Sequence, residues 1–184
     1  LNGNAPINIL GDGGSIEYTD EEGATLTNPV DVTGDGGNFR SRIAGSVFEF
    51  TGALTGDEEL EINDGTGGNP VQAGTIFLNG DASAFAGDVQ VKQSILRLGA
   101  NTVLGADDFE LEDGATLEFD IQSPTTFGRV NPLDDVTLES GSTIAPRFTG
   151  GLPTGVTTFD LFSGSTDVED EGVVIDDNAL VQFG

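Results

Sequence analysis

The sequence predicts an all-β protein: a single-stranded, right-handed parallel β-helix (β-solenoid) of roughly nine coils of about 20 residues each. Short runs alternate apolar with polar residues, as strands with one buried face do. Turn-forming Gly, Asp, Asn and Thr separate the runs. The runs also recur at a nearly constant interval, and no helical periodicity longer than two turns interrupts them. At 184 residues, we expect a single solenoid domain spanning residues 1–184.

Each alternating run predicts one short strand whose apolar residues point into the core. In chain order the apolar pairs are Ile7/Ile9, Ile16/Tyr18, Val30/Val32, Phe48/Phe50, Leu60/Ile62, Ile76/Leu78, Val89/Val91, Leu96/Leu98, Phe109/Leu111, Leu117/Phe119 and Val136/Leu138.

The interval between runs predicts which residues stack on one wall. Leu78, Leu98, Phe119 and Leu138 follow one another at about 20 residues each, so we expect them on the same wall. Further stacks are expected for Val89 with Phe109, for Ile9 with Val30 and Phe50, and for Tyr18 with Phe39 and Leu60. A jelly roll or sandwich whose strand spacing imitates a repeat is the alternative.

The composition excludes several functions. Cys and His are absent, which excludes disulfides, thiolate or imidazole metal sites and His-dependent nucleophiles. The net charge of −26 argues against a nucleic-acid partner, because a polyanion would be repelled. We expect no membrane insertion, since no apolar stretch is long enough. Position 1 is Leu and no basic n-region follows it, so we expect a mature or excised piece of a larger exported precursor.

Residues 74–161 carry a family resemblance. The segment has a Gly-x-Ile-x-Leu strand, an aromatic, a Val-x-Val strand, a Leu-x-Leu strand and Leu-Gly pairs. The matching residues are Gly74, Ile76, Leu78, Gly80, Phe85, Gly87, Val89, Val91, Leu96, Leu98, Gly99, Leu104, Gly105 and Gly114 to Phe119, with Ser94 near where the family has glycine. This pattern resembles the autotransporter-associated β-strand repeat of bacterial surface passengers. The resemblance implies an exported right-handed β-helix, extracellular or on the bacterial cell surface.

Carboxylates are the candidate metal ligands, because Ca²⁺ prefers oxygen donors. Asp12 and Asp35 both lie in Gly-Asp-Gly-Gly, three residues after Ile9 and Val32, so they are expected one coil apart, although the motif also forms plain turns. The other candidates are the pairs Asp107/Asp108 and Asp134/Asp135 and the acidic run of Asp167, Glu169, Asp170, Glu171, Asp176 and Asp177. A solvated acidic surface is the alternative interpretation.

The expected function is non-catalytic and structural: a subunit of an extracellular fibre, sheath or adhesive passenger, associating head-to-tail with its own copies and supported by Ca²⁺. The first alternative is an adhesin module that binds glycan or a host protein through exposed aromatics; the candidates are Tyr18, Phe85, Phe127, Phe148, Phe162 and Phe183. The second, a polysaccharide lyase-like enzyme, would need a basic catalytic residue, and the chain has only six Lys and Arg residues.

Overall fold

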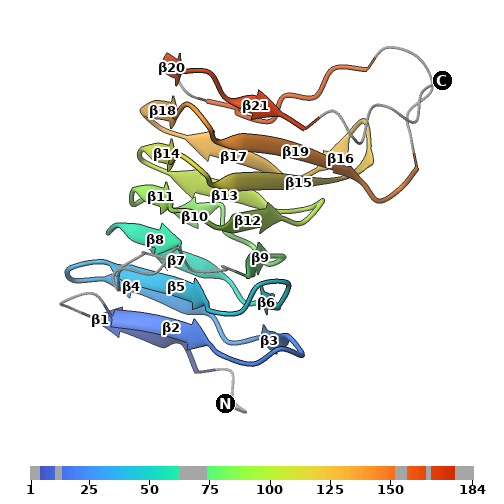
Figure 1. The fold of residues 1–184 in the computed structure, drawn as a ribbon. Coiled ribbons are helices and arrows are strands. Elements are labelled where there is room, and N and C mark those ends of the chain that lie inside the picture. Colours follow the sequence, from blue (N-terminus) through green and yellow to red (C-terminus); the bar gives the residue numbers. More distant parts are fainter. Residues whose placement is uncertain (1–4, 11–13, 63–73, 152–156, 165–166, 177–184) are drawn as a thin grey trace.

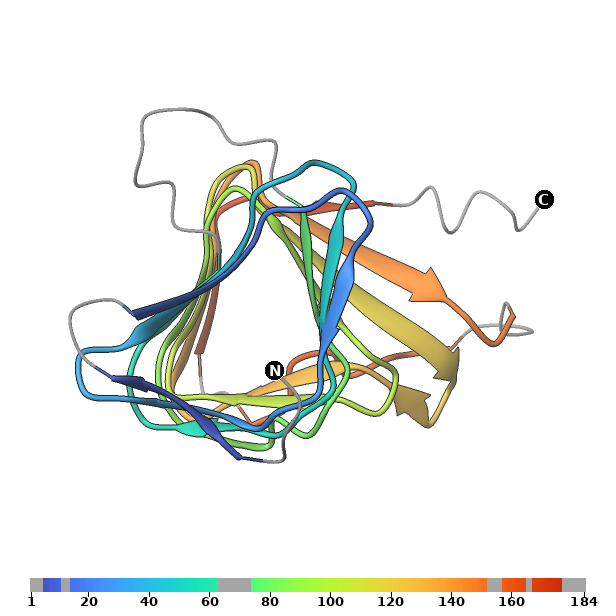
Figure 2. The same ribbon diagram turned by 90° about the horizontal axis from the view of Figure 1, so that it is seen from below.

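The protein is a three-walled parallel β-solenoid. The computed structural model describes residues 5–10, 14–62, 74–151, 157–164 and 167–176, and these residues contain strands but no helix. Successive turns of the chain stack along one axis (Figure 1), and the cross-section seen along that axis is triangular (Figure 2). Neighbouring strands on every wall are parallel, which confirms the predicted solenoid and contradicts the sandwich or jelly-roll alternative.

Each described turn contributes one strand to walls B and C, and each except the last contributes one to wall A. Wall A contains β1 (Ile7–Leu10), β4 (Val30–Thr33), β7 (Leu54–Gly56), β10 (Ala84–Phe85), β13 (Val103–Ala106) and β17 (Arg129–Pro132), with single bridges joining Ala82 to Leu104 and Val130 to Phe162. Wall B contains β2 (Gly14–Tyr18), β5 (Gly37–Ser41), β8 (Leu60–Ile62), β11 (Val89–Val91), β14 (Phe109–Leu111), β18 (Asp135–Leu138) and β20 (Asp167–Asp170). Wall C contains β3 (Ala24–Leu26), β6 (Val47–Phe50), β9 (Thr75–Leu78), β12 (Ile95–Leu98), β15 (Thr116–Ser123), β19 (Thr143–Phe148) and β21 (Val174–Ile175).

The predicted nine coils were wrong. Walls B and C have seven strands each in the part of the chain that the structure describes, so the solenoid has fewer coils than expected. The interval between rungs is also not constant. On wall B it is short between Val91 and Leu111 and clearly longer between Leu111 and Leu138, although both pairs lie on adjacent rungs. Longer loops at the corners lengthen some turns. Insertions of this kind in surface loops lower the stability of the fold only slightly.

Three of the four residues expected on one wall are there. Leu78, Leu98 and Phe119 pair in register on wall C. Leu138 was assigned wrongly: it lies on wall B opposite Leu111, and Pro146 faces Phe119 instead. The chain between β15 and β19 is longer than the assumed interval. The position expected to reach wall C therefore still lies on wall B.

The other expected stacks are partly right. Val89 pairs with Phe109, as predicted. The predicted stack of Ile9, Val30 and Phe50 was wrong, because Ile9 pairs with Val32 and Phe50 lies on wall C. The stack of Tyr18, Phe39 and Leu60 was also wrong: the N-terminal turns on wall B are longer than the assumed interval, so Phe39 pairs with Ile16 and Ile62.

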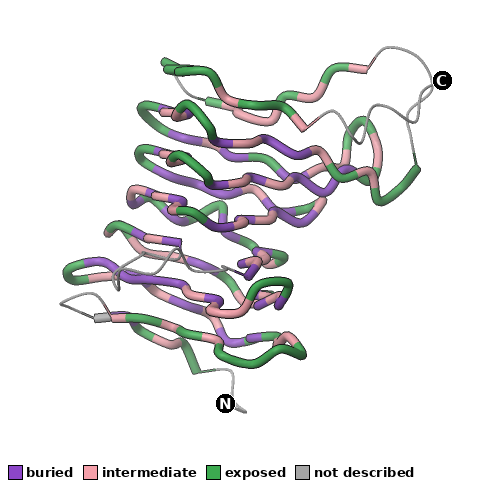
Figure 3. Tube along the Cα trace, viewed as in Figure 1, coloured by how far each residue is buried: buried purple, intermediate pink, exposed green. Residues whose placement is uncertain are grey.

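Buried residues recur along the successive turns of the trace (Figure 3), and their side chains form the ladders of the core. Phe39, Phe109 and Phe119 are its largest fully buried side chains, and Phe39 stacks on Phe50 with ring centroids 4.2 Å apart. Burial of like side chains on successive rungs supplies apolar contact without helices or disulfides.

An extension leaves the triangular outline on one side. β15 and β19 continue past the wall, and β16 (Thr126–Phe127) folds back on β15 as an antiparallel partner. Figure 2 shows these strands projecting away from the coil. Rings of Phe127 and Phe148 contact Phe159 edge to face, at 5.4 and 6.1 Å between centroids. We call this projection, β15 beyond Asp120 with β16 and the end of β19, the fin.

The corner between walls B and C requires a left-handed residue. Gly45, Gly114 and Gly141 occupy it with φ of 82°, 77° and 92°. On the rung between β11 and β12 the position belongs to Gln93, at φ 41°. In the left-handed region a Cβ atom clashes with the backbone, which destabilises the fold, and glycine has no Cβ atom.

Gln93→Gly is therefore expected to raise the free energy of unfolding by about 0.5–1 kcal/mol, because relief of strain exceeds the added entropy of the unfolded chain. Urea unfolding followed by circular dichroism measures the change. Gln90→Gly, within β11, is the matched control and should lower stability. Equal effects of the two substitutions would contradict the proposed strain.

Candidate functional site

The outer face of wall B carries the strongest concentration of acidic side chains. On five successive rungs an acid directly precedes the first inward residue of the strand, so the acids stack one per rung. This acidic column consists of Glu59, Asp88, Asp108, Asp135 and Asp167. Adjacent members are about one strand spacing apart along the axis, roughly 4.8 Å.

Backbone contacts connect the middle of the acidic column. The Asp108 N–H donates to Asp88 Oδ1 at 3.3 Å, and the Asp135 N–H donates to Asp108 Oδ1 at 3.0 Å. Glu110 and Glu169 project from the same wall and, together with residues of the acidic column, line two shallow grooves. The carboxylates therefore form a continuous negative strip parallel to the solenoid axis.

Repulsion between neighbouring carboxylates raises the pKa of one member of the acidic column, Asp135. The neighbouring Asp134 carboxylate, followed by partial desolvation and by Asp108, Asp167 and Glu169, raises the pKa of Asp135 above its usual value. A raised carboxyl pKa means that the folded protein binds the proton more tightly than the unfolded chain. Ionised Asp135 therefore opposes folding above that pKa.

Asp135→Asn is expected to give a small rise in melting temperature at neutral pH and low salt. The gain should fade as the pH falls through the raised pKa, because the wild-type side chain is then neutral as well, and it should fade in high salt. Thermal unfolding at neutral and acidic pH tests this. The control Asp160→Asn removes an exposed acid outside wall B and its acidic column, and it should have a smaller effect. A destabilised Asp135→Asn protein would contradict the repulsion.

Lys92 follows β11 and lies within the acidic surface of wall B. The Lys92 ammonium donates to Glu61 Oε1 at 2.5 Å and is 3.9 Å from Glu112 Oε1. Burial lowers the pKa of Lys92, but the hydrogen bond and charge of Glu61 outweigh it and the pKa is raised. Burial also raises the pKa values of Glu59 and Glu112. Lys92 thus acts as a fixed counter-ion.

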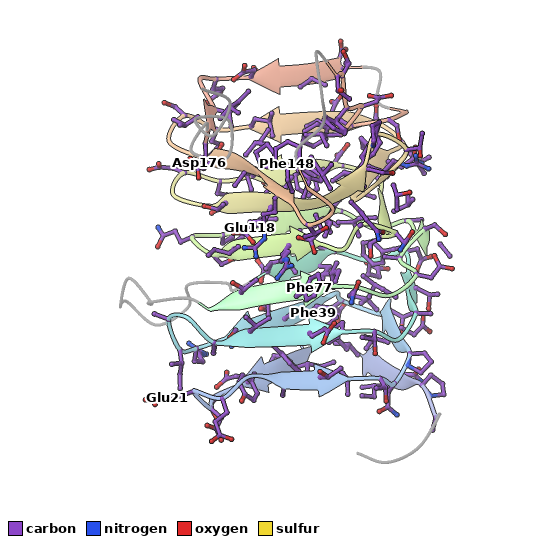
Figure 4. All side chains as sticks on the ribbon, turned by 90° about the vertical axis from the view of Figure 1, so that its right-hand side faces the viewer. Glu21, Phe39, Phe77, Glu118, Phe148 and Asp176 are labelled. Carbon is purple, nitrogen blue, oxygen red and sulfur yellow. The ribbon has the colours of Figure 1, made fainter. Side chains whose placement is uncertain are left out.

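Wall C carries a different arrangement on its outer face. Arg97 donates through Nε and Nη2 to the two carboxylate oxygens of Asp120, at 2.9 and 2.7 Å. Its guanidinium lies 4.2 Å from the ring centroid of Phe77 on the preceding rung. Arg147 donates to Glu118 at 3.0 Å and approaches Asp120 at 3.4 Å. Figure 4 shows Phe77 and Glu118 on this side of the solenoid. These contacts connect side chains of four successive strands on wall C, which are β9, β12, β15 and β19.

The predicted metal ligands do not form one cluster. Asp107 and Asp108 are exposed where walls A and B meet, Asp35 occupies the equivalent corner of an earlier rung, and Asp167 and Asp170 lie on β20. Asp176 follows β21. Within the ranges that the structure describes, no group of three or more acidic side chains is arranged to hold a metal ion.

The predicted pairing of Asp12 with Asp35 lies partly outside the described residues, as does Asp177. Ile9 and Val32, the residues that place the two motifs, are paired on wall A. The expected adjacency of those strands is therefore confirmed, and Ca²⁺ binding remains a prediction.

Sequence reasoning missed Glu59 and Asp88 as members of the acidic column. The signal was available: an acid immediately before the inward residue recurs on wall B. This recurrence becomes visible only when the strands are aligned with their true turn lengths. A constant interval does not bring the acids of different rungs into the same column.

The aromatic candidates for adhesion are mostly packed. Phe85 is buried, Tyr18 stacks on Phe48 at 5.3 Å, and Phe162 contacts Phe109 and Phe119. Phe127 and Phe148 are half-buried in the fin, and Phe183 lies outside the described residues.

No protein-family model matches the chain, and searches of curated proteins and of solved structures gave no match. Among the described residues there is no helix of a length and apolarity suited to crossing a membrane. The fold and the arrangement of charges are therefore the basis for any functional assignment.

Proposed function

We propose that this protein is a non-catalytic structural β-solenoid of the bacterial cell surface or extracellular space, forming part of a fibre, sheath or adhesive passenger of the autotransporter-repeat type. One observation carries the proposal: the ladders of walls B and C run without interruption from β2 and β3 to β20 and β21. Such a stack is a spacer or building block, because each rung serves mainly to support the next.

The right-handed sense belongs to the same proposal. Parallel crossover connections strongly favour that hand. Seen from the N-terminal end, the chain in Figure 2 runs clockwise as it recedes, which agrees with it.

We further propose that cations, with Ca²⁺ as the physiological example, support assembly of copies. The acidic column and the net charge of −26 oppose close approach of two molecules. Divalent cations neutralise carboxylates directly, and salt shortens the range of the repulsion.

Electron microscopy of the purified protein with Ca²⁺ and with a chelator tests the function. Filaments or end-joined rods that depend on Ca²⁺ are the expected result, with Mg²⁺ and high NaCl as controls for general screening. Dispersed rods of one length under all these conditions would contradict assembly.

An adhesin that binds glycan or host protein is the second candidate, and the fin favours it. The fin places Phe127 and Phe148, both half-buried, on a projection outside the coil. Binding on a glycan array that Phe148→Ala abolishes, with folding retained, would support this role. A catalytic role is disfavoured because Lys92 and Arg97 are engaged in ion pairs.

A further inference from the structure

The C-terminal rung exposes apolar residues in positions that are core positions on the preceding rungs. Val168 continues the inward column of Val136, and Ile175 continues that of Ile144. Their side chains are 52 and 59 % exposed. Within the described part of the chain, β20 and β21 have a neighbour on one side only.

The N-terminal rung begins the same two columns with small residues. Gly14 starts the column that ends at Val168, and Ala24 starts the column that ends at Ile175. If a second copy continues the stack in register, Val168 faces Gly14 and Ile175 faces Ala24. A large side chain then meets a small one on both walls, and the strands stay parallel.

We propose that β20 and β21 of one copy dock on β2 and β3 of a second copy, head to tail, with Val168 and Ile175 as the apolar contacts. This inference rests on the proposed structural function and names its partner surface. A second copy fits this edge because it presents strands from the same two walls, in the same direction and with complementary side-chain sizes.

Asp170 limits the strength of this contact. Its column runs through Ile16, Phe39, Ile62, Val91, Leu111 and Leu138 and ends at the carboxylate. Asp170 would face Ile16 of the next copy. Its Oδ1 accepts from the N–H groups of Gly172 and Val173, both at 2.9 Å, so it also holds the turn after β20. An inward charge on an edge strand discourages uncontrolled pairing.

Both ends are acidic, which makes the contact salt-dependent. The N-terminal rung carries Glu17, Asp20, Glu21 and Glu22, and the C-terminal rung carries Asp167, Glu169, Asp170 and Glu171. Association should therefore be weak at low salt and increase as salt or divalent cations screen the two ends.

A mixing experiment tests the polarity. Ile175→Asp blocks the C-terminal end, and Ala24→Glu blocks the N-terminal end; circular dichroism confirms that each variant folds. In sedimentation velocity at high salt, each variant alone should be monomeric, the mixture should form dimers only, and the wild type should form longer species. Dimers of either variant alone would overturn the head-to-tail arrangement.

Asp170→Asn tests the limiting charge, because asparagine keeps the acceptor for the turn. We expect the dissociation constant between copies to fall about tenfold. Asp107→Asn is the matched control, since it removes the same charge from an exposed mid-solenoid corner and should change association little. Equal effects of the two would overturn the role of Asp170.

The outcomes separate this inference from the proposed function. Ca²⁺-dependent filaments whose formation ignores Ile175→Asp and Ala24→Glu would retain the structural function and overturn this interface. A wild type that stays monomeric in salt and in Ca²⁺ would overturn both.

Discussion

Replacing Phe119 with alanine is expected to lower the free energy of unfolding by about 3–5 kcal/mol, because a large buried ring leaves a cavity that its neighbours fill only in part. Phe119 is fully buried on wall C between Leu98 and Pro146 on the adjacent rungs. It also contacts the ring of Phe162 edge to face at 5.9 Å. Because each rung packs on its neighbours, the lost packing of Phe119 destabilises rungs in the interior of the solenoid.

Urea unfolding followed by far-ultraviolet circular dichroism measures this loss. Phe148→Ala removes the same ring from the fin, where the side chain is half-buried, and is expected to cost about 1–2 kcal/mol. If the two substitutions cost the same, Phe119 would not be part of a continuous core ladder.

Replacing Arg97 with methionine is expected to cost about 2–4 kcal/mol, since removal of one partner leaves a nearly buried charge uncompensated. Methionine keeps the apolar stem but loses both hydrogen bonds to Asp120, whose side chain is only 8 % exposed. The estimate lies below that for a fully buried pair, because Arg97 is 20 % exposed and Arg147 stays near Asp120. The contact with Phe77 is lost as well.

Arg147→Met is the matched control on the same wall. Arg147 is 43 % exposed, so its ion pairs are screened by water and their loss should cost less than about 1 kcal/mol. Similar losses for the two arginine variants in urea unfolding would show that the buried carboxylate does not depend on Arg97.

Local alternation predicted the all-β class, and the recurrence of the runs at about 20 residues predicted the parallel solenoid. Strand after strand, the residues expected to point inward do so, from Ile76 and Leu78 to Leu117 and Phe119. Which strands pair could not be predicted with the same accuracy, because the pattern alternates within each strand but corner loops vary freely in length. Leu138 illustrates this: it alternates correctly, yet it lies one wall away from its expected place.

The arrangement of charges was harder to predict than the core. Individual acids such as Asp108 and Asp167 were recognised, but their alignment with Asp88 and Asp135 depends on the register between rungs. The pairing of Arg97 with Asp120 likewise joins residues on two different rungs, and only the coil brings them together. Which residues meet across rungs depends on the lengths of the corner loops. The alternation of apolar residues within the strands gives no information about those lengths.

The walls also determine how the molecule responds to force. Strands on each wall hydrogen-bond mainly to the rung before and the rung after. Tension applied between the two ends of the chain acts on one outermost rung at a time, so we expect stepwise peeling at low force and not a single abrupt rupture. Sideways load, in contrast, is shared by three sheets at once, and the same molecule should then behave as a stiff strut.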